Sequence, residues 1–292
     1  MSALRVTRRE ALFAATAVGM GLTLSPALRA LAADEKRLFK IGACDWSIGK
    51  GGQPGALELA KQIGLDGVQV TFGAPGDQYD LRKEEVRREY LQAAEKHNVA
   101  IASLAMGVLN SVPYSSDPNA EQWVRECVEV MPKLGQKVVL LAFFGAGDIK
   151  GKPDLQDEVI RRLKRVAPAA EKAGVVLAVE SWLDAADHLR ILDAVGSPAV
   201  QVYFDVANME NQGYDVYREI RRLGRERICE VHCKENGFLL GKGRVDFVKV
   251  KEAFDEIGWS GWLVIEGAVG QGMNMFDSYV QNQKYLRSIF PT

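Results

Sequence analysis

The sequence has few cysteines, no concentrated basic segment beyond its N-terminus and no apolar run long enough to cross a membrane. Four cysteines occur in 292 residues, so a domain of this size does not depend on a disulfide framework. Without a clustered Lys/Arg surface, binding to the phosphates of a nucleic acid is not expected. The apolar stretch Ala11–Leu24 falls short of the ~20 residues that a spanning helix requires.

Hydrophobic residues make up 47% of the chain and charged residues 26%, and 37 basic residues nearly balance 38 acidic ones. A chain of this length and composition can bury a large core as one domain. No long repeat, low-complexity tract or linker divides it. The sequence therefore predicts a single globular domain that follows a short N-terminal leader.

Residues 1–32 have the order of charge, apolar region and small-residue site that is typical of an export signal. Arg8 and Arg9 precede Ala11–Leu24, and Ala30–Ala32 supplies the cleavage site. This order predicts a cleaved twin-arginine signal peptide, a periplasmic or otherwise exported protein, and the twin-arginine translocase as a transient partner. An N-terminal helix or a membrane anchor is the alternative. The apolar stretch is short for a spanning helix, and no cysteine follows the cleavage site, so no stable membrane anchor is expected.

Past the leader, short apolar runs alternate with amphipathic stretches, the pattern of strands that are each followed by a helix. Strands are expected at Phe39–Trp46, Gly67–Phe72, Val99–Gly107, Val138–Phe144, Val175–Trp182, Val200–Val206, Ile228–Lys234 and Trp262–Gly267. Helices are expected at Gly55–Ile63, Lys83–His97, Asn119–Leu134, Leu155–Ala173, Ala185–Val195, Tyr214–Leu223, Val245–Ile257 and Phe276–Ile289. This alternation predicts an α/β fold, a single (β/α)8 TIM barrel within residues 33–292.

Glycines stand where the expected helices end. Gly64, Gly135, Gly174, Gly196, Gly224 and Gly258 each follow the last residue of a helical pattern, as C-terminal capping predicts. A doubly wound open sheet is the alternative fold, and it would normally carry a Gly-rich phosphate turn after its first strand. The segment Gly49–Gly52 lacks the Gly-x-Gly-x-x-Gly spacing of that turn, so the closed barrel is favoured.

Strands five to eight each end at or near a residue that can bind a metal ion: Glu180, Asp205, His232 and Glu266. Functional residues of such barrels gather at this end, and neighbouring strands lie ~5 Å apart, so the four side chains can converge. Three carboxylates and one imidazole suit Mn²⁺ best, with Mg²⁺ or Co²⁺ possible and Zn²⁺ less suitable. Loading in the cytoplasm before export would protect such a site from copper and zinc. Unrelated ion pairs at the barrel rim are the alternative, and a lone His232 would more often be a hydrogen-bonded core residue.

Three further side chains at the strand ends are candidates for contacts with a substrate. Trp46 ends strand one, and Trp182 lies one step beyond Glu180 with the same parity, so either indole can form an apolar wall for a sugar ring. Packing beneath a loop is the alternative, and it applies more to Trp46 than to Trp182. Lys234 shares the parity of His232 and can reach a substrate hydroxyl or a developing oxyanion, or it can pair with a neighbouring glutamate.

Strand alternation and loop position give two weaker predictions. If His232 points into the barrel, Cys229 and Cys233 lie on the opposite face under the helices, so neither is expected to be a ligand or a nucleophile. Asn110 and Tyr114 follow strand three and are candidates for hydrogen bonds to a sugar by their loop position alone.

The motifs at these positions resemble the xylose-isomerase-like barrels, the sugar phosphate isomerase/epimerase group. The resemblance covers about residues 38–290. Its carriers are Gly64–Gln69, Val179–Ser181, Phe204–Asn208, Val231–Glu235, Leu240–Phe247 and Gly258–Glu266. These motifs are specific for the fold and the metal site, and they say little about the substrate.

By this resemblance, the metal ligands would be Glu180, Asp205, His232 and Glu266, and the two glutamates would also act as the acid/base pair of the ketose epimerases. A metal bound to a carbonyl and an adjacent hydroxyl acidifies the C–H between them and stabilises the enediolate. Two carboxylates on opposite faces can then remove and return the proton. The resemblance thus implies an enzyme that acts next to a sugar carbonyl.

The sequence departs from many epimerases at two substrate-binding positions. Asn208 stands where they have a histidine, and Lys234–Asn236 stands where they have an arginine. We expect Asn208 to contact the substrate. The expected function is isomerisation or epimerisation of an unphosphorylated sugar or keto-sugar, and a homo-oligomer is compatible with it.

Three alternatives differ in chemistry. A lyase or dehydratase of a keto-glycoside or inosose would use the same metal site, and a non-catalytic sugar-binding barrel would not need opposed carboxylates. An abasic-site endonuclease of the same group is disfavoured, because its histidine-rich zinc cluster needs more than the three histidines present.

Overall fold

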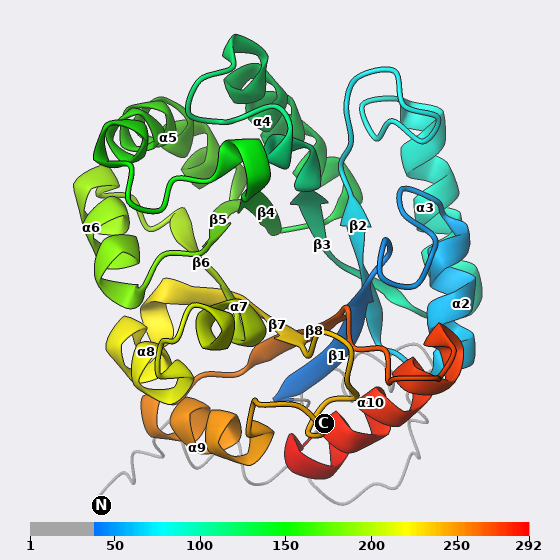
Figure 1. Ribbon diagram of the computed structural model, residues 1–292. Coiled ribbons are helices and arrows are strands. Elements are labelled where there is room, and N and C mark those ends of the chain that lie inside the picture. Colours follow the sequence, from blue (N-terminus) through cyan, green and yellow to red (C-terminus); the bar gives the residue numbers. More distant parts are fainter. Residues whose placement is uncertain (1–37, 292) are drawn as a thin grey trace, which may run out of the picture. The chain divides into compact units, whose positions relative to one another are not determined.

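The computed structural model describes residues 38–291, and the predicted signal peptide of residues 1–32 lies outside them. Within the described range, parallel strands form a closed barrel in the order of the chain, β1 to β8 (Figure 1). They are β1 Phe39–Cys44, β2 Gly67–Thr71, β3 Ala100–Met106, β4 Val138–Phe143, β5 Val176–Ser181, β6 Val200–Asp205, β7 Ile228–Lys234 and β8 Gly261–Glu266. The predicted (β/α)8 architecture is confirmed.

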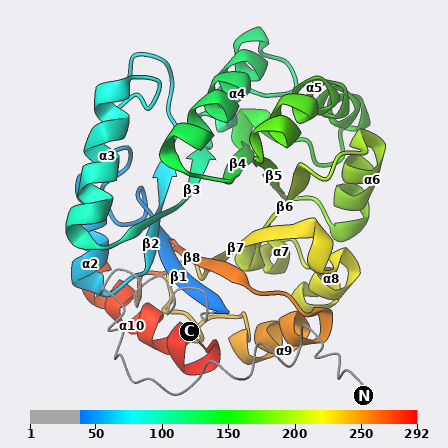
Figure 2. The same ribbon diagram turned by 180° about the vertical axis from the view of Figure 1, so that it is seen from behind.

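Helices surround the barrel on its outside (Figure 2). They are α2 Gly55–Ile63, α3 Glu84–His97, α4 Pro118–Val130, α5 Pro153–Ala173, α6 Ala185–Val195, α8 Val216–Leu223, α9 Phe247–Ile257 and α10 Met275–Ile289. The short helix α7 Val206–Asn211 directly continues β6 at the C-terminal end of the barrel. Short 3₁₀ helices lie at η1 Gly107–Asn110, η2 Met131–Leu134, η3 Gly145–Gly147 and η4 Arg225–Arg227. In this part of the chain no helix has the length and apolar character needed to cross a bilayer.

Helix ends follow the local chemistry of the sequence. The expected helix Asn119–Leu134 divides into α4 and η2 because Pro132 has no N–H to donate and fits only the first turn of a new helix. α8 begins later than expected because Asp215 caps it, with the carboxylate accepting the N–H groups of Tyr217 and Arg218. The predicted glycine caps are left-handed except Gly224, whose ψ of 173° is extended.

The strands bury their two faces in different surroundings. Outward-facing residues such as Ile41, Val68 and Val179 are fully buried against the helices. Inside the barrel, a smaller cluster consists of Ala105, Leu140, Ala142, Ala178 and Tyr203. Two alanines of this inner cluster, Ala105 and Ala142, border an open space at the C-terminal end of the barrel.

Trp262 fills the opposite, N-terminal end of the barrel. It lies beside Lys40 in the ladder of β1 and β8, and the Lys40 ammonium is 5.6 Å from the centre of its ring. Glycines on the neighbouring strands make room for the indole, because a Cβ added at Gly67 would lie 2.6 Å from the Trp262 ring. Trp262, Gly42 and Gly67 thus close the N-terminal end of the barrel, far from the C-terminal ends of the strands.

A register shift places one cysteine differently from the prediction. The β6–β7 ladder shifts between Val202 and Tyr203, which breaks strict strand alternation. Cys229 therefore packs against the inner cluster, and the prediction that it lies under the helices was wrong. Cys233 lies beyond the shift and is buried in the outer core, as predicted.

Candidate metal centre and substrate cavity

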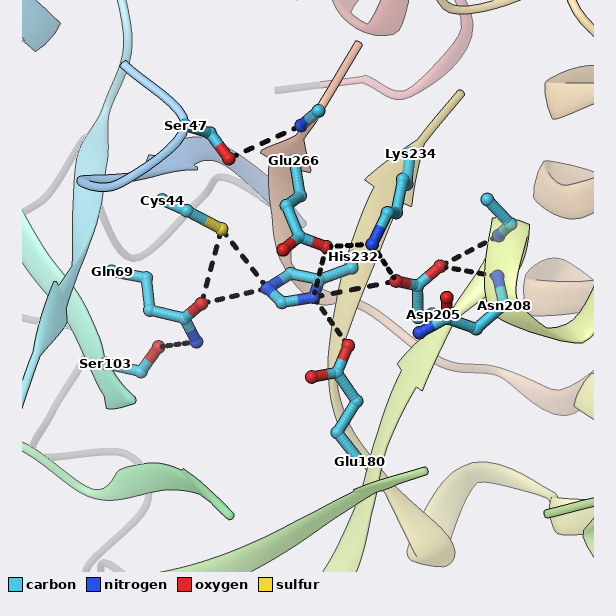
Figure 3. A network of polar contacts seen from close by, with 12 residues as sticks. Cys44, Ser47, Gln69, Ser103, Glu180, Asp205, Asn208, His232, Lys234 and Glu266 are labelled. Atoms are coloured by element: carbon cyan, nitrogen blue, oxygen red, sulfur yellow. Dashed lines mark hydrogen bonds and ion pairs between the residues drawn. The ribbon is translucent and has the colours of Figure 1, made fainter. Parts of the chain in front are cut away.

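Glu180, Asp205, His232 and Glu266 converge at the C-terminal end of the barrel (Figure 3). They lie at the ends of β5 and β6, within β7 and at the end of β8, and each offers one potential ligand atom. These four atoms all lie within 4.8 Å of one another. Strand register brings them together, since Asp205 is opposite His232 in the ladder and the next inward residue, Lys234, is opposite Glu266.

The His232 ring is fully buried at the centre of the three carboxylates. Its Nδ1 lies 2.8 Å from Glu180 Oε1, 3.5 Å from Glu266 Oε2 and 3.9 Å from Asp205 Oδ2. Burial disfavours the charged ring, but the nearby carboxylates outweigh it and raise the pKa of His232 to about 9. Nδ1 is thus the atom that faces the site.

The other ring nitrogen is held by Gln69 of β2. His232 Nε2 lies 2.8 Å from Gln69 Oε1, and the Gln69 amide donates to Ser103 Oγ at 3.0 Å. An amide oxygen only accepts, so Nε2 carries a proton and the neutral ring has its lone pair on Nδ1. A lone pair that faces three carboxylates is stable only with a proton or a cation between them. The geometry therefore fits a bound cation.

Gln69 was not among the predicted site residues. The available signal was its position, because it is a polar residue in the buried strand Gly67–Thr71 and the last residue of the motif Gly64–Gln69. Such a residue needs a partner inside the barrel, but the sequence does not show which one.

Asp205 uses its two oxygens differently. Oδ1 caps α7 and accepts the N–H groups of Ala207 and Asn208, both at 2.9 Å. Oδ2 is buried without a hydrogen bond, and Lys234 Nζ is 3.5 Å away. Burial raises the pKa of Asp205 to about 7, against the opposing charge of Lys234. A buried carboxylate oxygen without a hydrogen bond is a second feature that a cation would satisfy.

Glu266 is held as a carboxylate by two donors. Lys234 Nζ donates to Oε2 at 2.8 Å and Trp46 Nε1 donates to Oε1 at 3.0 Å. Burial would raise the pKa of Glu266, but His232 and Lys234 lower it to about 2. Burial likewise opposes the charge of Lys234, but Asp205 and Glu266 raise its pKa. Three carboxylates and one ammonium leave two negative charges, the charge that a divalent cation balances.

A cavity of about 670 Å³ opens above these residues, and each predicted substrate contact lies on its wall: Trp46, Trp182, Asn208 and Lys234. Trp46 is 38% exposed, so the alternative of packing beneath a loop does not describe it. Trp182 packs against Phe144 at 5.3 Å between ring centres.

The two residues predicted from the loop after strand three lie in different surroundings. Asn110 lines the cavity, and its Oδ1 accepts the Phe144 N–H at 3.0 Å. Tyr114 is fully buried, with its ring edge against Phe143 in the core, so its predicted position at the substrate was wrong. An aromatic residue in a loop fills the core as readily as a cavity wall.

Fold and site together define a (β/α)8-barrel protein with a carboxylate-rich candidate metal centre at the C-terminal strand ends. Residues 57–289 match the model of the xylose isomerase-like TIM barrel family. The chain belongs to that family.

Two curated relatives have related sequences. A 2-epi-5-epi-valiolone 7-phosphate 2-epimerase of Actinoplanes sp. is 27% identical over 177 residues, which cover 60% of this chain and 65% of the relative, less than two thirds of its length. A D-psicose 3-epimerase of Enterocloster bolteae is 25% identical over 240 residues, which cover 74% of this chain and 77% of the relative.

Solved structures show the same fold. D-psicose 3-epimerase of Clostridium cellulolyticum H10 with D-tagatose superposes with a TM-score of 0.73 and 19% identity, over 87% of this chain and 100% of that one. A 3-keto-D-glucoside 4-epimerase of E. coli gives a TM-score of 0.70 and 16% identity, over 86% and 99%. At these identities the likeness extends to the fold alone.

Proposed function

We propose that this protein is a divalent-metal-dependent isomerase or epimerase of an unphosphorylated sugar or keto-sugar. The observation that carries the proposal is the cluster of Glu180, Asp205, His232 and Glu266, whose ligand atoms lie within 4.8 Å of one another at the base of a cavity. The two curated relatives are a 2-epi-5-epi-valiolone 7-phosphate 2-epimerase and a D-psicose 3-epimerase. Mn²⁺ is the cation that we expect, because the donors are mainly carboxylates.

The two glutamates are suited to move a proton. A divalent cation, when bound, would polarise a carbonyl and a neighbouring hydroxyl of the sugar and so acidify the C–H bond between them. Glu180 and Glu266 approach the His232 ring from opposite sides (Figure 3), and both line the cavity. We assign the removal of the proton to one of these carboxylates and its return to the other.

Polar and aromatic neighbours would orient the sugar. Lys234 and Asn208 line the cavity beside the centre and can donate to hydroxyl groups or to an oxygen that gains negative charge. Trp182 offers an apolar wall. Among residues 38–291, Lys234 is the one basic side chain on this cavity, and Glu266 and Asp205 already hold it. A phosphate usually requires uncommitted arginine or lysine, which supports an unphosphorylated substrate.

We also propose that the protein is exported by the twin-arginine pathway to the periplasm. The support is the order of charge and apolar residues within positions 1–32. Replacing both Arg8 and Arg9 by lysine should keep the protein in the cytoplasmic fraction. Periplasmic recovery of that variant in undiminished amount would refute the assignment.

Deuterium incorporation tests the reaction. The Mn²⁺-loaded protein is incubated in D₂O with keto-sugars, 3-keto-glycosides and inososes, and the products are followed by NMR. Deuterium on the carbon next to the carbonyl, in a product with an inverted stereocentre or a shifted carbonyl, supports the proposal, provided that it is absent from the Glu266→Gln variant. A product that has lost a leaving group would favour a lyase instead. Tight sugar binding with neither exchange nor conversion would indicate a binding protein.

A further inference from the structure

The cavity above the candidate metal centre is larger than a single sugar. Its volume is about 670 Å³. A hexose displaces about seven water molecules at ~30 Å³ each, or roughly 200 Å³. When one sugar ring lies at the centre, space for at least one more ring therefore remains.

The remaining space lies over β2, β3 and β4. The four potential ligands come from β5 to β8, so the polar groups gather on one side of the barrel mouth. On the other side, Ala105, Leu140 and Ala142 line the cavity with buried apolar groups. Gly107 also lines it, and a Cβ added there would meet nothing within 4 Å. Small side chains thus keep this half open.

An aromatic pair lies between the two halves. Phe144 follows β4, Trp182 follows β5, and the ring centres are 5.3 Å apart. Both line the cavity, and Trp182 is two residues beyond the potential ligand Glu180. Aromatic faces of this kind pack well against the C–H face of a sugar ring.

Polar groups at the edge of the apolar half suit hydroxyl groups. Asn110 and the exposed carboxylate of Asp77 both line the cavity there. A carboxylate and an amide can bond several hydroxyls of a second sugar. These groups favour a sugar over a purely aromatic substituent in this half.

We propose that the substrate is a glycoside with two sugar rings. The reacting ring lies at the candidate metal centre, and the second ring lies over β2–β4 against Phe144 and Trp182. This inference rests on the proposed function and names the substrate class for the same site. The second-ring subsite contributes affinity and carries no part of the proton transfer.

Calorimetry can compare one-ring and two-ring ligands. The Mn²⁺-loaded Glu180→Gln protein, in which turnover of the ligand is slowed, is titrated with methyl 3-keto-β-glucoside, 3-keto-cellobiose, 3-keto-maltose and p-nitrophenyl 3-keto-β-glucoside. At least one of the two disaccharides should bind about tenfold more tightly than the methyl glycoside. The same titrations on Glu266→Gln guard against a background variant that fails to fold or to hold Mn²⁺.

Two variants locate the subsite. Gly107→Leu fills the open half and Phe144→Ala removes part of the aromatic wall, so each should abolish the tenfold preference and leave affinity for the methyl glycoside unchanged. Gly55→Leu is the matched control, because a Cβ at Gly55 also meets nothing within 4 Å and the residue lies outside the cavity. It should keep the preference.

Several outcomes would overturn the inference. They are equal affinities for all four ligands, binding of none of them, or a preference that survives in Gly107→Leu. A gain confined to the nitrophenyl ligand would assign the subsite to aromatic groups and also refute it. Deuterium exchange with monosaccharides alone would keep the proposed function and remove the two-ring substrate. Tight disaccharide binding without exchange in the wild type would keep the second-ring subsite but remove the proposed function, and with it the two-ring substrate.

Discussion

Replacement of Gln69 by leucine should weaken metal binding although Gln69 is not a ligand. The substitution removes the oxygen that lies 2.8 Å from His232 Nε2 and keeps a side chain of similar size in a fully buried position. The Nε2–H group would then have lost its amide acceptor, and its nearest remaining partner would be the Cys44 sulfur at 3.3 Å. Sulfur is a weak acceptor.

The size of the expected loss in Mn²⁺ affinity follows from the cost of leaving the His232 Nε2–H group without an acceptor. An unsatisfied buried N–H costs about 1–3 kcal/mol, so the ring gains by moving its proton to Nδ1, which has carboxylates at 2.8 and 3.5 Å. A proton on Nδ1 occupies the atom that would bind the cation. We therefore expect the affinity for Mn²⁺ to fall by about 10- to 100-fold, the usual effect of losing such a partner.

Two measurements together test this reasoning. Competition with a fluorescent chelator gives the Mn²⁺ affinity, and ¹⁵N NMR of the imidazole in the metal-free protein at high pH reports which nitrogen is protonated. Gln69→Leu should show both weaker binding and a shift of the proton to Nδ1. Gln69→Glu retains an acceptor and should keep the proton on Nε2.

Gln201→Leu is the matched control, because this half-buried glutamine bonds the Pro198 carbonyl at 3.4 Å. It should change neither readout. An affinity within twofold of wild type in Gln69→Leu, with the proton still on Nε2, would refute the proposed role of Gln69.

Three further predictions concern the same barrel. His232 and Asp205 have pKa values raised to about 9 and about 7, and both must lose a proton to bind a cation. The Mn²⁺ affinity measured by calorimetry should therefore rise with pH, with up to two protons released per bound ion below pH 7 and one above it. An affinity that stays constant from pH 6 to 8.5 would contradict this. Glu180→Gln, assayed at saturating Mn²⁺, should lower deuterium exchange by about 10²–10⁴-fold, and unchanged exchange would remove Glu180 from proton transfer. Gly67→Ala places a Cβ 2.6 Å from Trp262 and should lower the free energy of unfolding by about 1–3 kcal/mol, measured in urea; the double variant with Trp262→Leu should recover part of the loss.

The barrel was predictable because its signals are local and repeated. Each strand is a short apolar run, and most helices end at a glycine, so the number and order of elements follow from the pattern. α7 was not predicted, because its six residues directly follow β6 and are too few to show a helical period. The β6–β7 register shift was also not predictable, since it depends on how two strands pair and not on either strand alone.

The positions of the four potential ligands could be predicted for the same reason, because each lies at or close to the end of a strand and the topology brings those ends together. The partners of these residues could not. The bond from Gln69 to His232 spans 163 positions, and the bond from Trp46 to Glu266 spans 220. Contacts at that separation depend on side-chain direction inside the barrel, which the pattern of apolar residues does not specify.

The double use of Asp205 limits how this position can evolve. One oxygen begins α7 and the other faces the metal centre. Asparagine could still accept the two N–H groups but would lose the negative charge. Glutamate would keep the charge, but its longer chain would displace the cap. Aspartate alone meets both demands. A lineage that abandoned the metal could therefore replace this residue readily, whereas in one that keeps the metal a change to asparagine or to glutamate would carry a cost.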